Sequence, residues 1–204
     1  MSQMFDESGK IIPLTLVEAG PCPVVQVKTD EKDDYQATQI GFGSIKDKNV
    51  KKPQLSHFKK AGLTKAYRYL REFKGEDLKV GDILTVSIFA KGDAVKISGI
   101  SKGKGFQGVV KRHGFKGGPA SHGTKHNLRA PGSIGTSFPE RVWRGKKMAG
   151  RMGSDRITLA GKLKIVQVDP DNNLLAVKGS LPGRKGSLLE IISAGKIDLS
   201  KKEE

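Results

Sequence analysis

The stretch from Ser101 to Arg156 is rich in positive charge and glycine, and it constrains the fold more than any other segment. It holds 13 of the 37 Lys and Arg residues, 12 of the 26 glycines, and two acids, Glu140 and Asp155. Its apolar residues follow neither the period of a strand nor that of a helix. Because such a segment buries too little apolar surface to offset the entropy of ordering it, we predict that it folds against a polyanion.

The bulk composition limits the classes of partner. The 204 residues carry a net charge of +16, which favours nucleic acid first and an anionic membrane surface second. No run approaches 18 apolar residues and no apolar signal segment leads the chain, so we expect a cytoplasmic protein without a membrane span. The single cysteine, Cys22, excludes an internal disulfide, and we interpret it as a packed residue rather than a reactive thiol.

Short β-branched runs on both sides of the basic stretch predict a mainly β fold. Many short strands at close spacing favour a small antiparallel β-barrel over parallel βαβ units. A charged hairpin tip is expected at 29–34, a polar loop at 41–52, and a two-turn helix at 53–61 with Pro53 at its first position. The predicted strands cover residues 10–18, 24–27, 35–40, 67–73, 82–88, 94–100, 157–159, 163–168, 174–178 and 188–192.

Strands on both sides make the basic stretch an insertion rather than a tail. We therefore predict a discontinuous β-barrel domain formed by residues 1–100 and 157–197, with the short helix near 53–61. Residues 101–156 form an extended nucleic-acid-binding insertion, and residues 198–204 form a charged tail.

A glycine pattern at the start of the insertion, Gly103 to Gly108, matches both the dinucleotide fingerprint and the glycine-rich loop of kinases. Neither interpretation is favoured, because Val109 to Gly114 is not expected to begin a helix and no acid follows at the spacing that holds a ribose. The glycines are instead expected to let the backbone approach phosphates, which lysines and arginines on either side neutralise.

Histidines and aromatic residues lie among these positive charges. His122 and His126 have a metal-ligand spacing, but no cysteine or acid completes a site, so contact with RNA bases is favoured over zinc. The aromatic residues suit either stacking on bases or packing beneath the loop, and both interpretations stay open; they are Phe106, Phe115, Phe138 and Trp143. No catalytic grouping is present, so we expect neither an enzyme nor a cofactor.

Several motifs together resemble the large-subunit ribosomal protein L-three family, and the resemblance covers nearly the whole chain. They are Phe89, Gly99, Ser101, Gly103–Gly105, Gly108 and Arg112, then His122–His126, Arg129–Gly135 and Gly145–Gly150, with Glu18–Cys22 and Arg71–Phe73 nearer the amino terminus.

This resemblance implies a barrel on the subunit surface with a long loop threaded into large-subunit rRNA of the 23S type. In that family the loop reaches toward the peptidyl-transferase centre, the protein acts early in subunit assembly, and neighbouring ribosomal proteins are further partners. No membrane and no small-molecule substrate is implied. The predicted RNA-binding residues are Lys102, Lys104, Gln107, Lys111, Arg112, His113, Lys116, His122, Lys125, His126, Arg129, Arg141, Trp143, Arg144, Lys146, Lys147 and Arg151.

Two other classes of function compete with this interpretation. One is a barrel-based translation or chromatin factor that binds nucleic acid transiently. The other is an enzyme that holds a nucleotide in the glycine loop. Stoichiometric residence in the large ribosomal subunit distinguishes the first interpretation from both.

Overall fold

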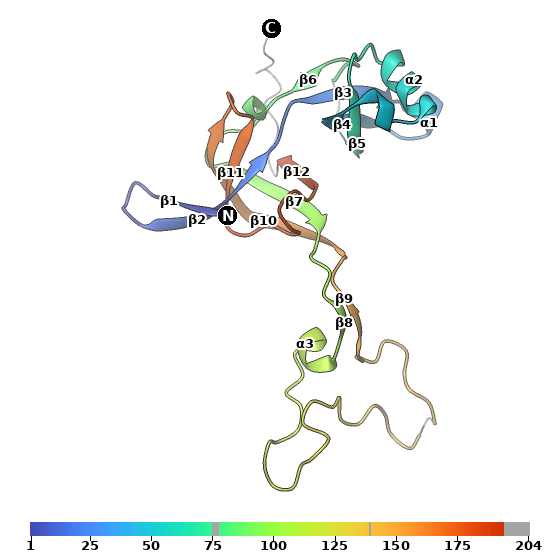
Figure 1. Cartoon of the computed structure of the whole chain (residues 1–204), viewed down its shortest axis with the longest axis vertical. Helices are drawn as coiled ribbons and strands as arrows, with labels where there is room; N and C mark the ends of the chain where they lie inside the picture. The colour runs from blue at the N-terminus through green and yellow to red at the C-terminus, as the bar shows by residue number, and fades with distance from the viewer. Residues whose placement is uncertain (75–77, 139, 194–204) are drawn as a thin grey trace. The chain divides into compact units, whose positions relative to one another are not determined.

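The computed structural model describes residues 1–74, 78–138 and 140–193, and the fold is mainly β, as predicted (Figure 1). The strands of this described part lie in three sheets, and the strand pairs with an assigned register are antiparallel. Closure into a barrel remains a prediction. The predicted tail at 198–204 and the end of the predicted barrel domain at 194–197 lie outside the described residues.

The largest sheet in the described chain has six strands. In spatial order they are β1 (Ser2–Phe5), β2 (Ile11–Glu18), β11 (Leu174–Lys178), β10 (Arg156–Asp169), β7 (Ala94–Ile100) and β12 (Leu189–Ser193). β-Branched and leucine side chains fill its interior, among them Val95, Ile165, Leu175 and Val177, which are each at most 1% exposed. The turn between β10 and β11 is fixed by Asp169, whose carboxylate accepts hydrogen bonds from the backbone and side-chain amides of Asn172.

A second sheet in the described chain has four strands, in the order β5 (Ala66–Phe73), β4 (Ala37–Ile45), β3 (Cys22–Lys28) and β6 (Ile83–Leu84). The charged tip between β3 and β4 contains one helical turn, α1 (Asp30–Asp33). Two 3-10 turns follow later in the chain, η1 (Asp47–Asn49) and η2 (Val86–Ile88).

The predicted two-turn helix is confirmed as α2 (Lys52–Lys60), with Pro53 in its first turn. Phe58 is 2% exposed and packs with Val25 and Ala66, which holds the helix on the second sheet. His57 is half-buried, and its Nε2 lies 2.8 Å from the side-chain oxygen of Gln39. Nε2 therefore carries the proton, because an amide oxygen can only accept.

Three sequence predictions are wrong in detail. The polar loop expected at 41–52 is strand until Ile45, because the ring of Tyr67 covers Gly41 and the glycine does not end the pairing. The strand expected at 82–88 is only Ile83–Leu84 before η2 turns the chain. The two strands expected at 157–159 and 163–168 are one strand, β10, which Gly161 continues at a positive φ of 72°.

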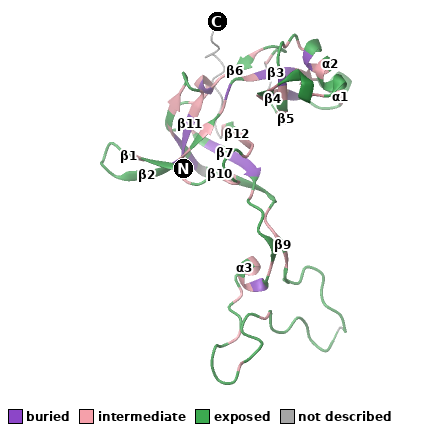
Figure 2. Ribbon diagram, viewed as in Figure 1, coloured by how far each residue is buried: buried purple, intermediate pink, exposed green. Residues whose placement is uncertain are grey.

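The chain divides into two compact units. One contains Met1–Lys96, Leu159–Ser180 and the described residues from Ile191 onward. The other contains Ile97–Thr158 and Leu181–Glu190, and so includes the whole basic insertion. Within it, β8 (Gly105–Gln107) pairs with β9 (Gly150–Met152), and α3 (Val109–His113) follows β8. Figure 2 shows that most of the insertion is exposed, in contrast to the strand interiors of the first unit.

Cys22 is half-buried, and its thiol lies 3.8 Å from the carbonyl oxygen of Ala19. Burial raises the pKa of this thiol to about 11, so the thiol stays protonated at neutral pH, as expected of a packed cysteine. No helix in the described residues is long and apolar enough to cross a membrane.

Candidate nucleic-acid interface

The insertion leaves the sheet through a neck of paired backbone. Ser101 donates its amide to the carbonyl of Asp155 at 2.9 Å, and Lys104 donates to the carbonyl of Met152 at 2.9 Å. Asp155 returns a hydrogen bond to the Ser101 hydroxyl at 3.2 Å. The outgoing and returning chains are therefore held together between the sheet and the pair of strands β8 and β9.

Two glycines allow this close approach. A Cβ on Gly153 would lie 2.1 Å from the carbonyl oxygen of Lys102, and Gly153 has a φ of +78°. A Cβ on Gly103 would lie 2.8 Å from the hydroxyl oxygen of Ser154. Sequence reasoning assigned Gly103 to contact with phosphates, whereas both glycines are needed for contacts inside the protein.

Beyond the neck, α3 turns the chain, and the prediction that no helix begins after Gly108 is wrong. Gly108 is the N-cap, and Gly114 ends the helix in the left-handed conformation with a φ of +72°. The helix has five residues, and the strand before it pairs antiparallel with β9. A dinucleotide fold needs a parallel βαβ unit at this point, so the geometry does not favour the dinucleotide interpretation.

Side chains from α3 tie the outgoing arm of the insertion to the returning arm. Arg112 Nη1 donates to the carbonyl of Met148 at 2.8 Å, and the Nε2 of His113 donates to the same oxygen at 3.0 Å. A Cβ on Gly150 would lie 2.5 Å from Arg112 Nη1, so the guanidinium packs on a glycine. Gln107, at the end of β8, donates its side-chain amide to the carbonyl of Lys104 within the outgoing arm. The three half-buried members of the predicted RNA-binding set thus make contacts within the protein.

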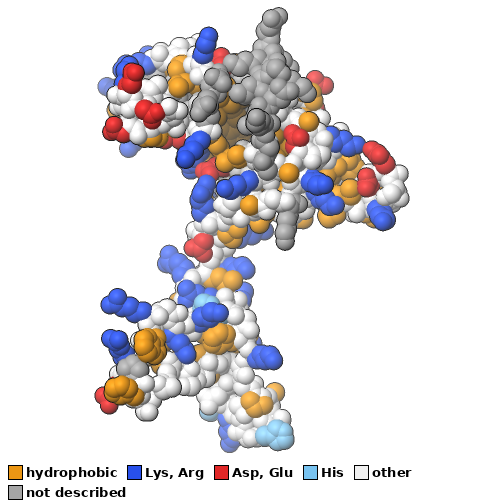
Figure 3. All heavy atoms as spheres, turned by 180° about the vertical axis from the view of Figure 1, so that it is seen from behind, with side chains coloured by type: hydrophobic (Ala, Val, Ile, Leu, Met, Phe, Trp, Pro, Cys, Tyr) orange, Lys and Arg blue, Asp and Glu red, His pale blue; other side chains and the backbone are white. Residues whose placement is uncertain are grey.

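The other fourteen residues of that set are all exposed. Eleven of them are Lys or Arg, and within residues 1–74, 78–138 and 140–193 no carboxylate forms an ion pair with any of the eleven. Figure 3 shows Lys and Arg side chains spread over one face of the insertion, with hydrophobic side chains among them. The fourteen are Lys102, Lys104, Lys111, Lys116, His122, Lys125, His126, Arg129, Arg141, Trp143, Arg144, Lys146, Lys147 and Arg151.

Three of the four aromatic residues in the insertion are exposed. Trp143 is 60% exposed, Phe106 76% and Phe138 86%. The guanidinium of Arg141 lies 5.9 Å from the centre of a Trp143 ring, at the outer limit of a cation–π contact. Phe115 is half-buried, and its ring centre lies 6.0 Å from that of His113. The structure therefore favours packing for Phe115 and leaves the other three rings accessible to bases.

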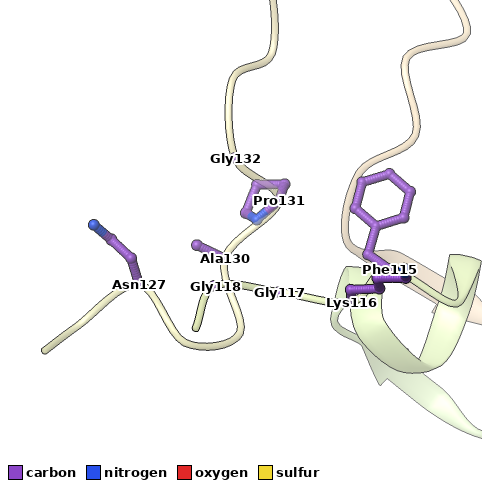
Figure 4. Close-up of a pocket in the computed structure, with 8 residues that line it drawn as sticks. All are labelled: Phe115, Lys116, Gly117, Gly118, Asn127, Ala130, Pro131 and Gly132. Atoms are coloured by element: carbon purple, nitrogen blue, oxygen red, sulfur yellow. The ribbon is translucent and has the colours of Figure 1, made fainter. Parts of the chain in front are cut away.

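The distal loop folds back on itself through glycine backbone. Gly118 donates its amide to the carbonyl of Leu128 at 3.1 Å, and a Cβ on Gly117 would lie 2.1 Å from the same oxygen. Figure 4 shows the open pocket beside this crossing, with the Phe115 ring next to α3 and Pro131 on the returning segment. The lining residues are Phe115, Lys116, Gly117, Gly118, Asn127, Ala130, Pro131 and Gly132.

The two histidines of the loop are exposed and do not lie on a helix; His122 has a positive φ of 58°. In the described part of the chain, no group of three or more His, Cys, Asp and Glu side chains is placed to hold a metal ion. The loop histidines can therefore act as single hydrogen-bonding or stacking groups.

Comparison with known proteins extends the resemblance seen in the motifs. Residues 37–173 match the family model of ribosomal protein L3. The chain is 52% identical over 198 residues to the large ribosomal subunit protein uL3 of Chloroherpeton thalassium, which covers 95% of each chain. The corresponding protein of Carboxydothermus hydrogenoformans is 51% identical over 199 residues, covering 96% of this chain and 94% of the relative. That of Desulfitobacterium hafniense is 49% identical over 192 residues, covering 93% and 89%.

Proposed function

The chain belongs to the ribosomal protein L3 family, and on this premise we propose that it is a structural, non-catalytic constituent of the large ribosomal subunit in the cytoplasm. Its role is in translation, as a protein that binds and braces rRNA. The relatives' names place them in the large ribosomal subunit, and the unpaired positive charge of the insertion supplies the chemistry for contact with rRNA.

The observation that carries this proposal is the set of eleven exposed Lys and Arg side chains on one extended, glycine-rich segment. A cation that has no carboxylate partner in the protein keeps its attraction for phosphate, and each phosphate that it neutralises releases a condensed counterion. The neck and α3 hold the base of the segment in place, so less conformational entropy is lost when these charges bind the RNA.

The exposed rings of Phe106, Phe138 and Trp143 supply a second kind of contact. A flat ring among cations stacks on an unpaired base, while the cations hold the backbone on both sides. Arg112 and His113 then act mainly by positioning the returning arm, although the guanidinium keeps donors beyond the one that binds Met148.

The resemblance to the family indicates where in the large subunit these contacts lie. We propose that residues 101–156 reach into large-subunit rRNA near the peptidyl-transferase centre, that the sheets lie toward the subunit surface beside neighbouring ribosomal proteins, and that binding supports early assembly. The protein has no catalytic role in this account, because the reaction centre that it braces is made of RNA.

The test is binding of the full chain to large-subunit rRNA across a salt series, together with sedimentation of cell lysate and quantitative mass spectrometry. With about 6–10 phosphate contacts, raising the salt from ~50 to ~200 mM weakens binding by about a thousandfold or more. Stoichiometric sedimentation with the large subunit is expected. A salt slope near zero, or a chain found mainly at the top of the gradient as for a transient factor, contradicts the proposal.

A further inference from the structure

Residues 46–65 form a second concentration of positive charge, far from the insertion in sequence. The segment contains seven lysines and one acid, Asp47. All seven lysines are exposed, and we call them the lysine surface: Lys46, Lys48, Lys51, Lys52, Lys59, Lys60 and Lys65. Sequence reasoning missed this surface because the glycine-rich insertion dominates the charge count. The signal that identifies this surface is the net charge of each segment, counted separately outside residues 101–156.

The backbone that carries the lysine surface is well anchored. Phe58 is 2% exposed, and the half-buried Leu55 and Val50 pack against the same cluster. Backbone hydrogen bonds close the turn before the helix, with Val50 donating to Asp47 at 3.0 Å and Leu55 to Lys51 at 3.1 Å. The lysines therefore project from a rigid turn and helix rather than from a free loop.

Acids of the same unit are concentrated in another stretch of the sequence. Four acids gather at the tip between β3 and β4, namely Asp30, Glu31, Asp33 and Asp34. No ion pair or side-chain hydrogen bond in the described residues engages the Nζ of any of the seven lysines of the lysine surface. Seven exposed lysines that no carboxylate pairs with in the described residues keep their attraction for an anionic partner.

The chemistry of the lysine surface differs from that of the insertion. None of the large hydrophobic side chains exposed in the described chain lies between residues 46 and 65. Lysine is a point charge on a flexible stem, and without exposed rings the surface offers no platform for stacking. A set of point charges on a helix about 13 Å long and on the turns beside it fits the sugar–phosphate backbone of a duplex.

We propose that the lysine surface is a second RNA-binding site, which takes the phosphate backbone of double-stranded RNA. The inference rests on the proposed function, namely that the chain binds RNA, and adds a site and a substrate class. Binding is then bipartite: the insertion holds single-stranded and irregular RNA through rings and cations, and the lysine surface holds a duplex through cations alone.

The experiment compares three variants of the full chain, each of which loses four positive charges. Glutamine has nearly the helix propensity of lysine and stays polar at an exposed position, so we expect each variant to fold. Thermal unfolding of each variant checks this. The lysine-surface variant carries Lys51→Gln, Lys52→Gln, Lys59→Gln and Lys60→Gln. The matched control carries Lys10→Gln, Lys32→Gln, Lys79→Gln and Lys178→Gln, which are exposed lysines elsewhere in the same unit. The insertion variant carries Arg144→Gln, Lys146→Gln, Lys147→Gln and Arg151→Gln.

Two probes are titrated over a salt series: a blunt RNA duplex and an unstructured single strand. For the duplex, the lysine-surface variant is expected to lower the slope of log affinity against log salt by about three to four, near 0.9 per lost contact, with little change for the control. For the single strand, the insertion variant is expected to show the larger loss.

Each outcome decides a separate claim. A lysine-surface variant that matches the control on the duplex, while the insertion variant loses affinity for the single strand, overturns this inference and leaves the proposed function standing. The lysine surface would then face an acidic protein or solvent. A wild-type chain that binds neither probe and no rRNA overturns the proposed function, and the inference falls with it.

Discussion

Substitution of Gly153 by alanine tests whether the neck holds the two arms of the insertion together. Alanine at a φ of +78° costs about 1–2 kcal/mol for the left-handed conformation alone. Its Cβ would also lie 2.1 Å from the carbonyl oxygen of Lys102, so one strand of the neck must move. That movement breaks neighbouring hydrogen bonds, such as the one from the Lys104 amide to the Met152 carbonyl. Each such bond contributes about 1 kcal/mol. We expect a total local cost of about 3–4 kcal/mol.

Gly105 provides a matched control in the same neck. Its φ is +69°, but a Cβ there would meet nothing within 4 Å, so Gly105→Ala carries the conformational cost without the clash. Amide hydrogen exchange of Ser101 and Lys104 is the assay, because both amides donate across the neck. A difference of about 2 kcal/mol between the variants corresponds to roughly 30-fold faster exchange in Gly153→Ala. Equal acceleration in the two variants would refute the reasoning, since it would leave the close approach at Gly153 without consequence.

Three further predictions concern other parts of the chain. Trp143→Ala is expected to weaken rRNA binding by about 1–3 kcal/mol while the melting temperature of the protein stays unchanged, as titration and calorimetry on one sample will show. Phe58→Ala removes the buried anchor of α2 and should lower the free energy of unfolding by about 3–5 kcal/mol in a denaturant titration. Hydrogen bonds from Lys28 and Tyr35 lower the pKa of the Glu72 carboxyl, so its contribution is present above the unfolded-state value of about 4.3 and is lost as pH falls through the folded value. Glu72→Gln should thus be slightly less stable than wild type at pH 7, by less than about 1 kcal/mol, and the two should converge in acid.

Elements with a strong local pattern were predictable from sequence. The strands near 10–18 and 94–100 alternate or run apolar over several residues, and α2 carries Pro53 at its start and Phe58 on its buried side. In these segments local preference and tertiary packing agree, so the pattern alone is sufficient.

Segments in which glycine sits inside an element were not predictable in the same way. Gly41 and Gly161 both lie within strands that sequence reasoning ended, because only the folded chain brings the Tyr67 ring over Gly41. The short helix α3 was missed because two valines, which are poor helix formers, open it. Its flanking glycines, Gly108 and Gly114, were the signal that could have identified it.

The candidate site was predictable as a composition but not as a geometry. Charge and glycine content located the insertion, and most of the predicted side chains are exposed in the structure. The contacts of Arg112 and His113 with the Met148 carbonyl could not be anticipated, because they join residues about 35 positions apart, beyond the paired strands β8 and β9.

Ultraviolet cross-linking of intact large subunits, followed by mass spectrometry of RNA-linked peptides, tests the central claim most directly. We predict that peptides of this chain carrying rRNA adducts come chiefly from residues 101–156, with Trp143 or Phe138 among the linked residues. A chain that sediments with the subunit but yields RNA-linked peptides only from outside 101–156 would contradict it, because the insertion would then not be the segment that binds rRNA.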